Sequence, residues 1–417
     1  MARLWRVWLR LAITMFAMGC GAKTGLRVPP PEDAAVESDA GVPCVELLPD
    51  GGPLYVELDT RAKLASADVV FLIDVTASML DEIEEIQDRL RDRIAPAIEA
   101  EIPDTQLGVA TFADFPVEPF GAPGDTPFSM LLPVTEDLAD VQSALDAIEI
   151  RNGLDDPESQ VEALYQLATG AGLGGFVPPS FGCPMGGRGY PCFREEALPI
   201  VLLFTDERFH NGPGGTFAYP SILSPAPHTY DEMSGALASL DLRVLGFDSG
   251  AGTASPDLIA VATDSGAVDA EGEPLVFDIG EEGQRLSTTV VDAMKRFANG
   301  VVFDVRSVVR DPDPDDGVDA TEFIDAVRPL RAEPMTGIER IDEASGRFLG
   351  VKAGTRLVYQ LTVVPGAVVP GAKTKRFRVN IVFFDEGGAR IGNRLVELVI
   401  PGDDEQGCPD EESVSLR

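Results

Sequence analysis

The chain has 417 residues, more than one hydrophobic core normally serves, so we expect two or three domains. It carries 69 Asp and Glu residues against 33 Lys and Arg residues, a formal net charge of −36. Because there is no surplus of basic groups to neutralise phosphate, this balance excludes nucleic-acid binding and favours solubility and the binding of cations.

The first 19 residues have the composition of a secretory signal peptide, so we do not expect them to belong to the fold. Arginines near the N-terminus precede the apolar run 11–18, which is too short to cross a bilayer as a helix. The run ends in AMGC, which is similar to the lipobox of bacterial lipoproteins, so we predict that Cys20 is lipidated. An ordinary signal peptide is the alternative.

Residue 21 is Gly, so the Asp that retains lipoproteins in the inner membrane of Gram-negative bacteria is missing. The sequence therefore favours a lipid-anchored protein of the bacterial outer membrane or cell surface. Residues 20–43 are rich in proline and poor in apolar residues, and we predict a flexible tether there.

Four further cysteines suit an oxidising compartment. Cys183 and Cys192 bracket a loop rich in Gly and Pro that a disulfide can close, and Cys44 and Cys408 lie near the two ends of the expected folded region. A metal site is the competing use of these cysteines, but the chain has no C-x-x-C and only two histidines.

The middle of the chain alternates apolar runs with segments of helical periodicity. The predicted strands are 69–73, 106–115, 197–206, 241–249 and 275–279. The predicted helices are 81–94, 137–148, 158–167, 230–240, 256–263 and 284–297. This alternation predicts an α/β domain over residues 66–299, with a doubly wound, mostly parallel sheet and helices on both faces.

After Ala298 the helical period stops, and short strand-like segments separated by turns follow. Those segments are 301–309, 355–364, 374–384 and 393–400, and two similar ones precede the α/β region at 43–49 and 53–60. We therefore predict an antiparallel β-sandwich of residues 44–65 and 300–405, into which the α/β domain is inserted. Residues 406–417 are expected to be a tail. The interruption would bring Cys44 and Cys408 to one end of the sandwich, which favours their pairing.

The strand 69–73 is followed by Asp74, Thr76 and Ser78, a D-x-T-x-S pattern. One carboxylate and two hydroxyls offer the hard oxygen ligands that Mg²⁺ and Ca²⁺ prefer. The competing interpretation of so short a motif is a strand end followed by a helix N-cap.

Further acids follow other predicted strands or precede a helix. Asp114 and Asp206 end strands, and Asp155 and Glu158 lie in the loop NGLDDPES before a helix. Ligands of α/β sheets bind beyond the carboxyl ends of the strands, so these acids should meet at one rim. Two carboxylates ~6 Å apart repel by roughly 3 kcal/mol at an effective dielectric of ~20, so we expect divalent cations among them.

These residues together resemble the von Willebrand factor A family, and specifically the inserted domain of integrin β subunits, over residues 44–400. The resemblance implies a main site for Mg²⁺ or Mn²⁺ made by the five residues Asp74, Thr76, Ser78, Glu158 and Asp206. It implies adjacent Ca²⁺ sites at Asp81 and Glu82, and at Asp114, Asp155, Glu158 and the carbonyl of Pro157. The chain departs from the family where Gly153 replaces an expected Asn.

The resemblance also implies a surface-anchored, cation-dependent adhesion or ligand-binding protein, whose main ion binds an Asp or Glu of a protein partner. In that family, binding couples to movement of the last helix, here 284–297. The alternative is a scaffold that assembles an envelope complex around a structural metal site. A metal-dependent hydrolase is least supported, because no motif positions a general base. At residue 210 we expect a hydrogen-bonded loop histidine rather than a group that tunes the site.

Overall fold

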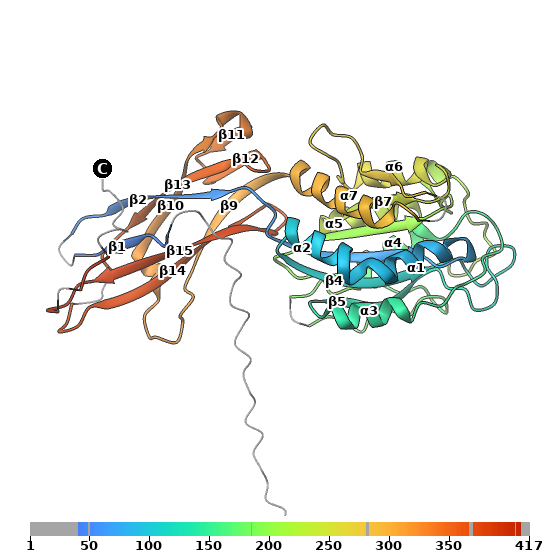
Figure 1. Cartoon of the computed structure of the whole chain (residues 1–417), viewed down its shortest axis with the longest axis horizontal. Helices are drawn as coiled ribbons and strands as arrows, with labels where there is room; N and C mark the ends of the chain where they lie inside the picture. The colour runs from blue at the N-terminus through green and yellow to red at the C-terminus, as the bar shows by residue number, and fades with distance from the viewer. Residues whose placement is uncertain are drawn as a thin grey trace, which may run out of the picture. The chain divides into compact units, whose positions relative to one another are not determined.

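The carboxyl rim expected from the sequence belongs to one of three β-sheets in the described part of the chain (Figure 1). The computed structural model describes residues 41–48, 51–184, 186–280, 283–366, 370–404 and 406–409, all within one compact unit. The predicted signal peptide, the lipidation of Cys20, nearly all of the tether and most of the tail lie outside these ranges.

The α/β sheet has the strand order β5-β4-β3-β6-β7-β8. Its strands are β3 (Ser66–Asp74), β4 (Asp104–Phe112), β5 (Ser129–Thr135), β6 (Leu198–Thr205), β7 (Arg243–Asp248) and β8 (Val276–Asp278). All neighbouring pairs are parallel except β4 with the edge strand β5. The predicted mostly parallel sheet is thus confirmed, and β5 is a strand that the sequence did not predict.

Helices cover both faces of this sheet. They are α1 (Leu80–Arg89), α2 (Ala95–Glu101), α3 (Leu138–Asp146), α4 (Gln160–Thr169), α5 (Tyr230–Leu240), α6 (Ser255–Asp264) and α7 (Leu286–Gly300). A π-helical turn, Leu90–Ile94, joins α1 to α2. Because side chains alternate along a strand, Phe71 of β3 packs in the core with α1, α2, α3 and α7, while Leu72 packs in the core with α4, α5 and α6.

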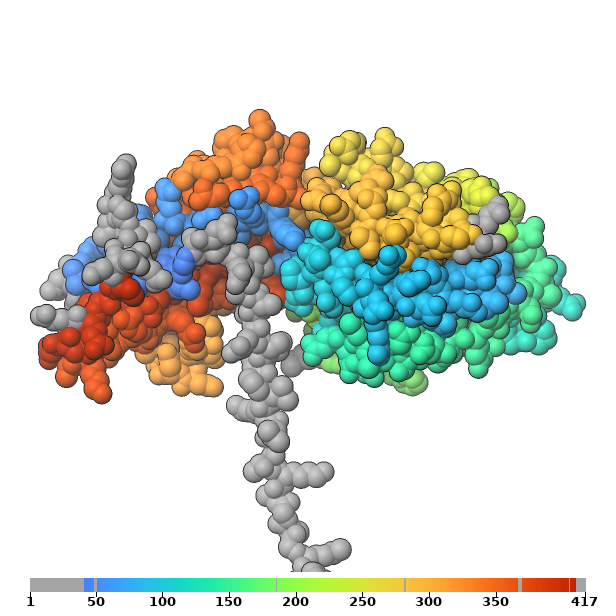
Figure 2. Space-filling model, viewed as in Figure 1, coloured from blue at the N-terminus to red at the C-terminus, as the bar shows by residue number. Residues whose placement is uncertain are grey.

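The α1 and α2 helices both pack against α7, and the three helices form much of the α/β surface seen in Figure 2. No helix among the described residues is long and apolar enough to cross a membrane.

The other two sheets hold the remaining strands, in the orders β1-β15-β14-β9-β12-β11 and β10-β13-β2. The strands are β1 (Cys44–Glu46), β2 (Leu54–Arg61), β9 (Val302–Arg310), β10 (Ile324–Glu333), β11 (Arg340–Asp342), β12 (Arg347–Lys352), β13 (Arg356–Val363), β14 (Lys375–Phe384) and β15 (Arg390–Ile400). The chain therefore leaves these sheets after β2 and returns to them at β9.

Two features of these sheets differ from the expectation of a purely antiparallel sandwich. The β1 strand pairs in parallel with β15, because its three residues enter the sheet from the same end as β15. The β10, β11 and β12 strands were not predicted; β10 contains Pro329 and a register shift beside it, which breaks the alternating pattern that sequence reasoning relies on.

Both predicted cysteine pairs form disulfides, Cys44–Cys408 and Cys183–Cys192. The metal-binding alternative for these four cysteines is therefore wrong. Cys44 opens β1, and Cys408 follows the end of β15. The first disulfide closes almost the whole described chain into a ring, whereas the second closes a short loop.

We expect the Cys44→Ala, Cys408→Ala double variant to lose more stability than the Cys183→Ala, Cys192→Ala double variant. The sequence separations are 364 and 9 residues, so the chain-entropy model gives a difference of about 3 kcal/mol. Urea unfolding under non-reducing conditions measures it, and each double variant is the other's control. An equal loss in both would contradict the expectation.

Candidate metal centre at the carboxyl edge of the sheet

The parallel strands bring the predicted acids to one edge. Asp74, the last residue of β3, lies in register with Phe112 at the end of β4, and the preceding Ile73 lies in register with Phe204 of β6. Because all three strands run the same way, Asp114 and Asp206 leave the sheet at the same edge as Asp74. The sheet itself therefore gathers carboxylates from three separate segments.

The D-x-T-x-S segment forms a tight local network. The backbone N–H and the hydroxyl of Thr76 donate to Oδ1 of Asp74 at 3.0 and 2.8 Å, and Thr205 Oγ1 donates to Oδ2 at 2.8 Å. The Oγ atoms of Thr76 and Ser78 lie 3.3 Å apart. Asp74 is fully buried, whereas Ser78 is exposed. The segment thus reaches from the sheet interior to the surface.

The loop before α4 brings Glu158 to the same edge. Its backbone N–H donates to the carbonyl of Arg208, and its own carbonyl accepts from the N–H of His210, so the loop is tied to the segment after β6. Gly153 has a φ of +62°, and a Cβ there would lie 2.8 Å from Glu158 Oε1. The glycine at position 153 therefore leaves room for the Glu158 carboxylate.

Burial and mutual repulsion dominate the electrostatics of this edge. Burial, with the charge of Asp206, raises the pKa of Asp74 to about 7. Burial also raises the pKa of Glu158 to about 12, with Asp74 and Asp114 as the strongest repelling charges. The pKa of Asp206 is raised by burial, and a hydrogen bond from Ser78 opposes the shift. In the absence of cations, burial and mutual repulsion therefore favour the protonated forms of these acids.

The predicted adjacent site combines one exposed acid with one buried acid. Asp81 is exposed and Glu82 is fully buried at the start of α1, and neither carboxylate oxygen of Glu82 has a hydrogen-bond partner among the described residues. Burial raises the pKa of Glu82 to about 7, with repulsion from Asp206 and Asp81. A Cβ at Gly283 would lie 3.2 Å from the Cα of Glu82, so the loop before α7 packs on this residue.

The predicted third site contains a residue that the sequence did not assign to it. Nε2 of His210 lies 3.4 Å from Oδ2 of Asp114 and 3.2 Å from Oδ2 of Asp155. These three residues form a group whose ligand atoms all lie within 4.8 Å of one another. Pro157 lines a cavity of about 360 Å³ beside Asp155 and His210. The expected loop histidine is thus hydrogen-bonded, and it also faces two acids.

Buried carboxylate oxygens without partners show that the edge fits cations. Among the described residues, oxygens of Glu82, Asp114, Asp155, Glu158 and Asp206 are buried and accept no hydrogen bond. A buried polar atom normally has a partner, because leaving it unpaired costs about 1–3 kcal/mol. Oxygens are the donors that Mg²⁺ and Ca²⁺ take. The side chains of Asp74, Thr76, Ser78, Glu158 and Asp206 could hold such an ion.

Three further residues support the edge and were missed by sequence reasoning. Asp125 is buried and accepts the N–H of Gly153 at 3.1 Å, which fixes the loop before α4. Tyr219 donates its hydroxyl to Oδ1 of Asp114. Thr205 bridges Asp74 and the amide of Gln160. Thr205 directly precedes Asp206, a position that could have pointed to it, but Asp125 and Tyr219 belong to irregular loops without such a signal.

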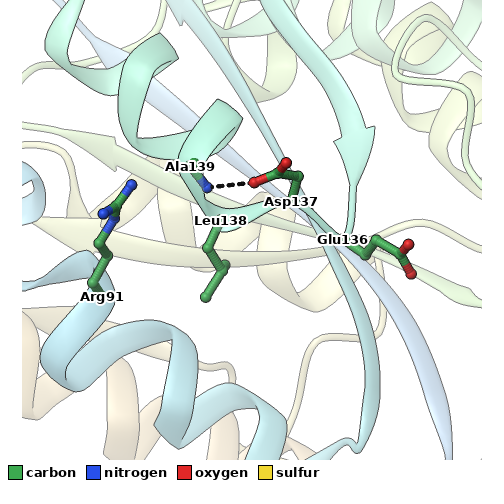
Figure 3. A pocket seen from close by; sticks show the side chains of 5 residues that line it. All are labelled: Arg91, Glu136, Asp137, Leu138 and Ala139. Carbon is green, nitrogen blue, oxygen red and sulfur yellow. Dashed lines mark hydrogen bonds between the residues drawn. The ribbon is translucent and has the colours of Figure 1, made fainter.

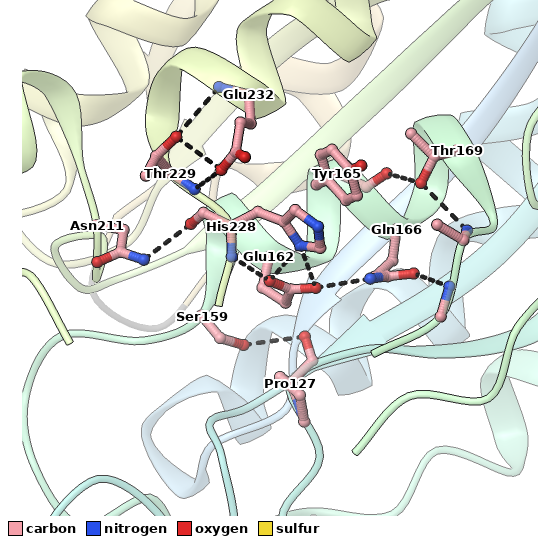
Figure 4. Close-up of polar contacts among 12 residues, drawn as sticks. Pro127, Ser159, Glu162, Tyr165, Gln166, Thr169, Asn211, His228, Thr229 and Glu232 are labelled. Carbon is pink, nitrogen blue, oxygen red and sulfur yellow. Dashed lines mark hydrogen bonds and ion pairs between the residues drawn. The ribbon is translucent and has the colours of Figure 1, made fainter. Parts of the chain in front are cut away.

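Two other polar features lie apart from this group. A surface hollow of about 720 Å³ is lined by Asp137, whose side chain accepts the N–H of Ala139 and so caps α3 (Figure 3). His228 is held by the buried Glu162 of α4 (Figure 4). The rings of Tyr165 and His228 are stacked, with their centroids 3.5 Å apart. Both contacts hold loops or helix ends in place.

The chain is structurally similar to solved von Willebrand factor A domains. The von Willebrand factor type A protein from Catenulispora acidiphila is 14% identical, with a TM-score of 0.36, over 92% of this chain and 78% of that one. The SpRpn10 VWA domain is 14% identical, with a TM-score of 0.32, over 54% of this chain and 94% of that one.

The pilus adhesin SpaC from Lactobacillus rhamnosus GG, in its open conformation, is also similar. It is 10% identical, with a TM-score of 0.31, over 83% of this chain and 45% of that one. No protein-family model matches the chain, and no curated protein matches it. Likenesses this distant say nothing about a ligand.

We expect Glu82→Gln to stabilise the metal-free protein above neutral pH. In the folded state the pKa of Glu82 is about 7 against an ordinary value of 4.5, so the stability that its proton supplies is present below pH 4.5 and is lost as pH rises through 7. Gln stays neutral at every pH, so the variant does not lose this stability as pH rises. In EDTA, the melting temperature of the variant should match wild type near pH 4 and exceed it by at least ~2 °C near pH 8.

The control is Glu84→Gln, an exposed position on the same helix, which should change neither value. With saturating Ca²⁺, wild type should instead melt at a higher temperature than Glu82→Gln, because the wild-type carboxylate can bind the ion. A variant less stable than wild type at every pH in EDTA would contradict this account.

Proposed function

We propose that the protein is a cation-dependent adhesion or ligand-binding protein that captures an acidic side chain of a protein partner at the carboxyl edge. One observation carries the proposal: segments around residues 74, 158 and 206 converge there, and Glu158 and Asp206 present buried oxygens that nothing in the described chain satisfies. A divalent ion would supply the positive charge that these oxygens lack.

The exposure of Ser78 supports a binding role for that ion. Asp74 and Glu158 are buried beneath the edge, whereas Ser78 is exposed and Asp206 is half-buried. An ion held by these residues would therefore meet solvent on one side. Mg²⁺ requires about six oxygens and keeps several waters in protein sites, so a partner carboxylate can replace a water. Mn²⁺ would serve in the same position, with Ca²⁺ at Glu82 and Asp81.

The setting that we propose is the bacterial cell envelope. The Cys44–Cys408 and Cys183–Cys192 disulfides suit an oxidising compartment outside the cytoplasm. A lipid on Cys20 and the tether that follows would anchor the binding edge to the outer membrane or cell surface. A protein held in this way can meet partners that carry an exposed Asp or Glu.

A scaffold with a structural metal site is the second candidate. It is favoured by the complete burial of Glu82 and Asp74, because an ion bound to buried groups stabilises the rim whether or not a partner arrives. In that case a partner would bind elsewhere on the protein, and the ion would change stability alone.

Asp74→Asn should strongly weaken Mg²⁺ binding at the main site. The amide keeps the shape of the side chain but removes the charge that balances the cation, so we expect the affinity to fall at least ~100-fold, or ~2.7 kcal/mol. Isothermal titration calorimetry measures it, and circular dichroism checks the fold. Asp88→Asn, an exposed position on α1, is the control and should bind as wild type does.

The adhesion proposal predicts metal-dependent recognition of carboxylates. On an array of peptides that carry Asp or Glu, paired with matched Asn or Gln peptides, wild type should bind only acidic members, in Mn²⁺ but not in EDTA. Asp74→Asn should bind none. Equal binding to the amide peptides, or binding that survives EDTA, would remove the adhesion proposal; intact Mg²⁺ binding without any peptide preference would favour the scaffold.

A further inference from the structure

The group at Asp114, Asp155 and His210 has a different chemistry from the main site. Asp114 follows β4, Asp155 lies in the loop before α4 and His210 follows β6, so three segments converge. Two members are carboxylates, and the third is an imidazole that is 5% exposed. Asp114 is fully buried, and its Oδ2 accepts no hydrogen bond among the described residues.

The hydrogen bonds of His210 fix which nitrogen faces the two acids. Nδ1 lies 2.6 Å from the carbonyl oxygen of Phe217. A carbonyl can only accept, so Nδ1 must carry a proton and donate it. In the neutral imidazole, Nε2 then has a free lone pair, and this lone pair points at Asp114 and Asp155. Two carboxylates and a lone pair repel one another unless a metal ion, or a proton on Nε2, lies between them. An N–H bonded to a backbone carbonyl is also the usual outer support of a metal-binding histidine.

The aromatic surroundings hold the imidazole in this orientation. The ring of Tyr219 stacks on His210 with centroids 4.0 Å apart, and Phe120 meets the imidazole edge-on at 5.5 Å. The hydroxyl of Tyr219 donates to Oδ1 of Asp114, which leaves Oδ2 facing His210. The group is therefore pre-oriented before any ion binds.

We propose that Asp114, Asp155 and His210 form a zinc site, separate from the main magnesium site. Tetrahedral ligands at about 2.0–2.1 Å from Zn²⁺ are about 3.3 Å apart. The observed separations from Nε2, 3.2 and 3.4 Å, match that value. Ca²⁺ and Mg²⁺ take oxygen ligands, whereas imidazole suits Zn²⁺ and its neighbours in the transition series. This donor set therefore favours Zn²⁺ at this site, in place of the Ca²⁺ that the family resemblance implies.

The proposed site can be reached from solvent, and its three protein ligands do not complete a tetrahedron. The cavity of about 360 Å³ is lined by Asp155 and His210, so an ion can reach them from solvent. Three protein ligands leave one of four tetrahedral positions for water. The inference does not rest on the proposed adhesion function, because none of these three residues belongs to the main site.

For the test, the purified protein is first stripped of metal with EDTA and then saturated with Mg²⁺. Zn²⁺ alone is titrated into this sample. We expect one Zn²⁺ to bind per chain. His210→Asn should weaken binding at least ~100-fold, because outer-shell partners alone are worth 10–100-fold. The chain has only one other histidine, so His228→Asn is the matched control and should bind as wild type does. X-ray absorption of the zinc form should show one nitrogen at about 2.0 Å.

Asp155→Asn, at a partly exposed position, keeps the test decisive if the histidine variant does not fold. Asp74→Asn separates the two proposals, since it should lose Mg²⁺ and retain Zn²⁺. The proposal is overturned if Zn²⁺ does not saturate one site, if both histidine variants bind equally, or if Ca²⁺ competes as well as Zn²⁺. If His210 is instead an imidazolium that pairs with the two acids without metal, Zn²⁺ will not saturate one site.

Discussion

Carboxylates that are buried together cannot all ionise without a compensating positive charge, and the carboxyl edge of the α/β sheet depends on this constraint. Parallel strands deliver Asp74, Asp114 and Asp206 to one edge, and the loop before α4 adds Glu158. Raised pKa values at Asp74 and Glu158 and unpaired buried oxygens are two expressions of the same shortage of positive charge. The sheet and its helices thus build an edge that lacks the positive charge its carboxylates need in order to ionise together.

Much of this edge could be predicted from the sequence because it follows from strand direction. The apolar runs that end at Asp74 and Asp206 are buried on both faces, which makes them recognisable and fixes where their last residues lie. Once strands and helices alternate, a parallel sheet follows, and acids at strand ends must meet. The pairing of Cys44 with Cys408 was likewise predictable from the interrupted sandwich.

What escaped prediction depends on contacts between irregular segments. The β10 strand contains a proline and a register shift, and β5 lies at the edge of the sheet, so neither shows a strong pattern. The role of His210 is set by the carbonyl of Phe217 and the ring of Tyr219, which no spacing rule connects to it. The reason for a glycine at position 153 becomes clear only from the structure, which places the Glu158 carboxylate beside it.

The link between α7 and β9 has a mechanical consequence. The helix ends at Gly300 and the strand begins at Val302, so Val301 alone separates them. One residue spans at most about 3.6 Å, whereas a shift of a helix by one turn is about 5.4 Å. So short a connection has no slack to absorb such a displacement. Any axial travel of α7 beyond a few ångströms must therefore pull on β9, or unwind the end of the helix.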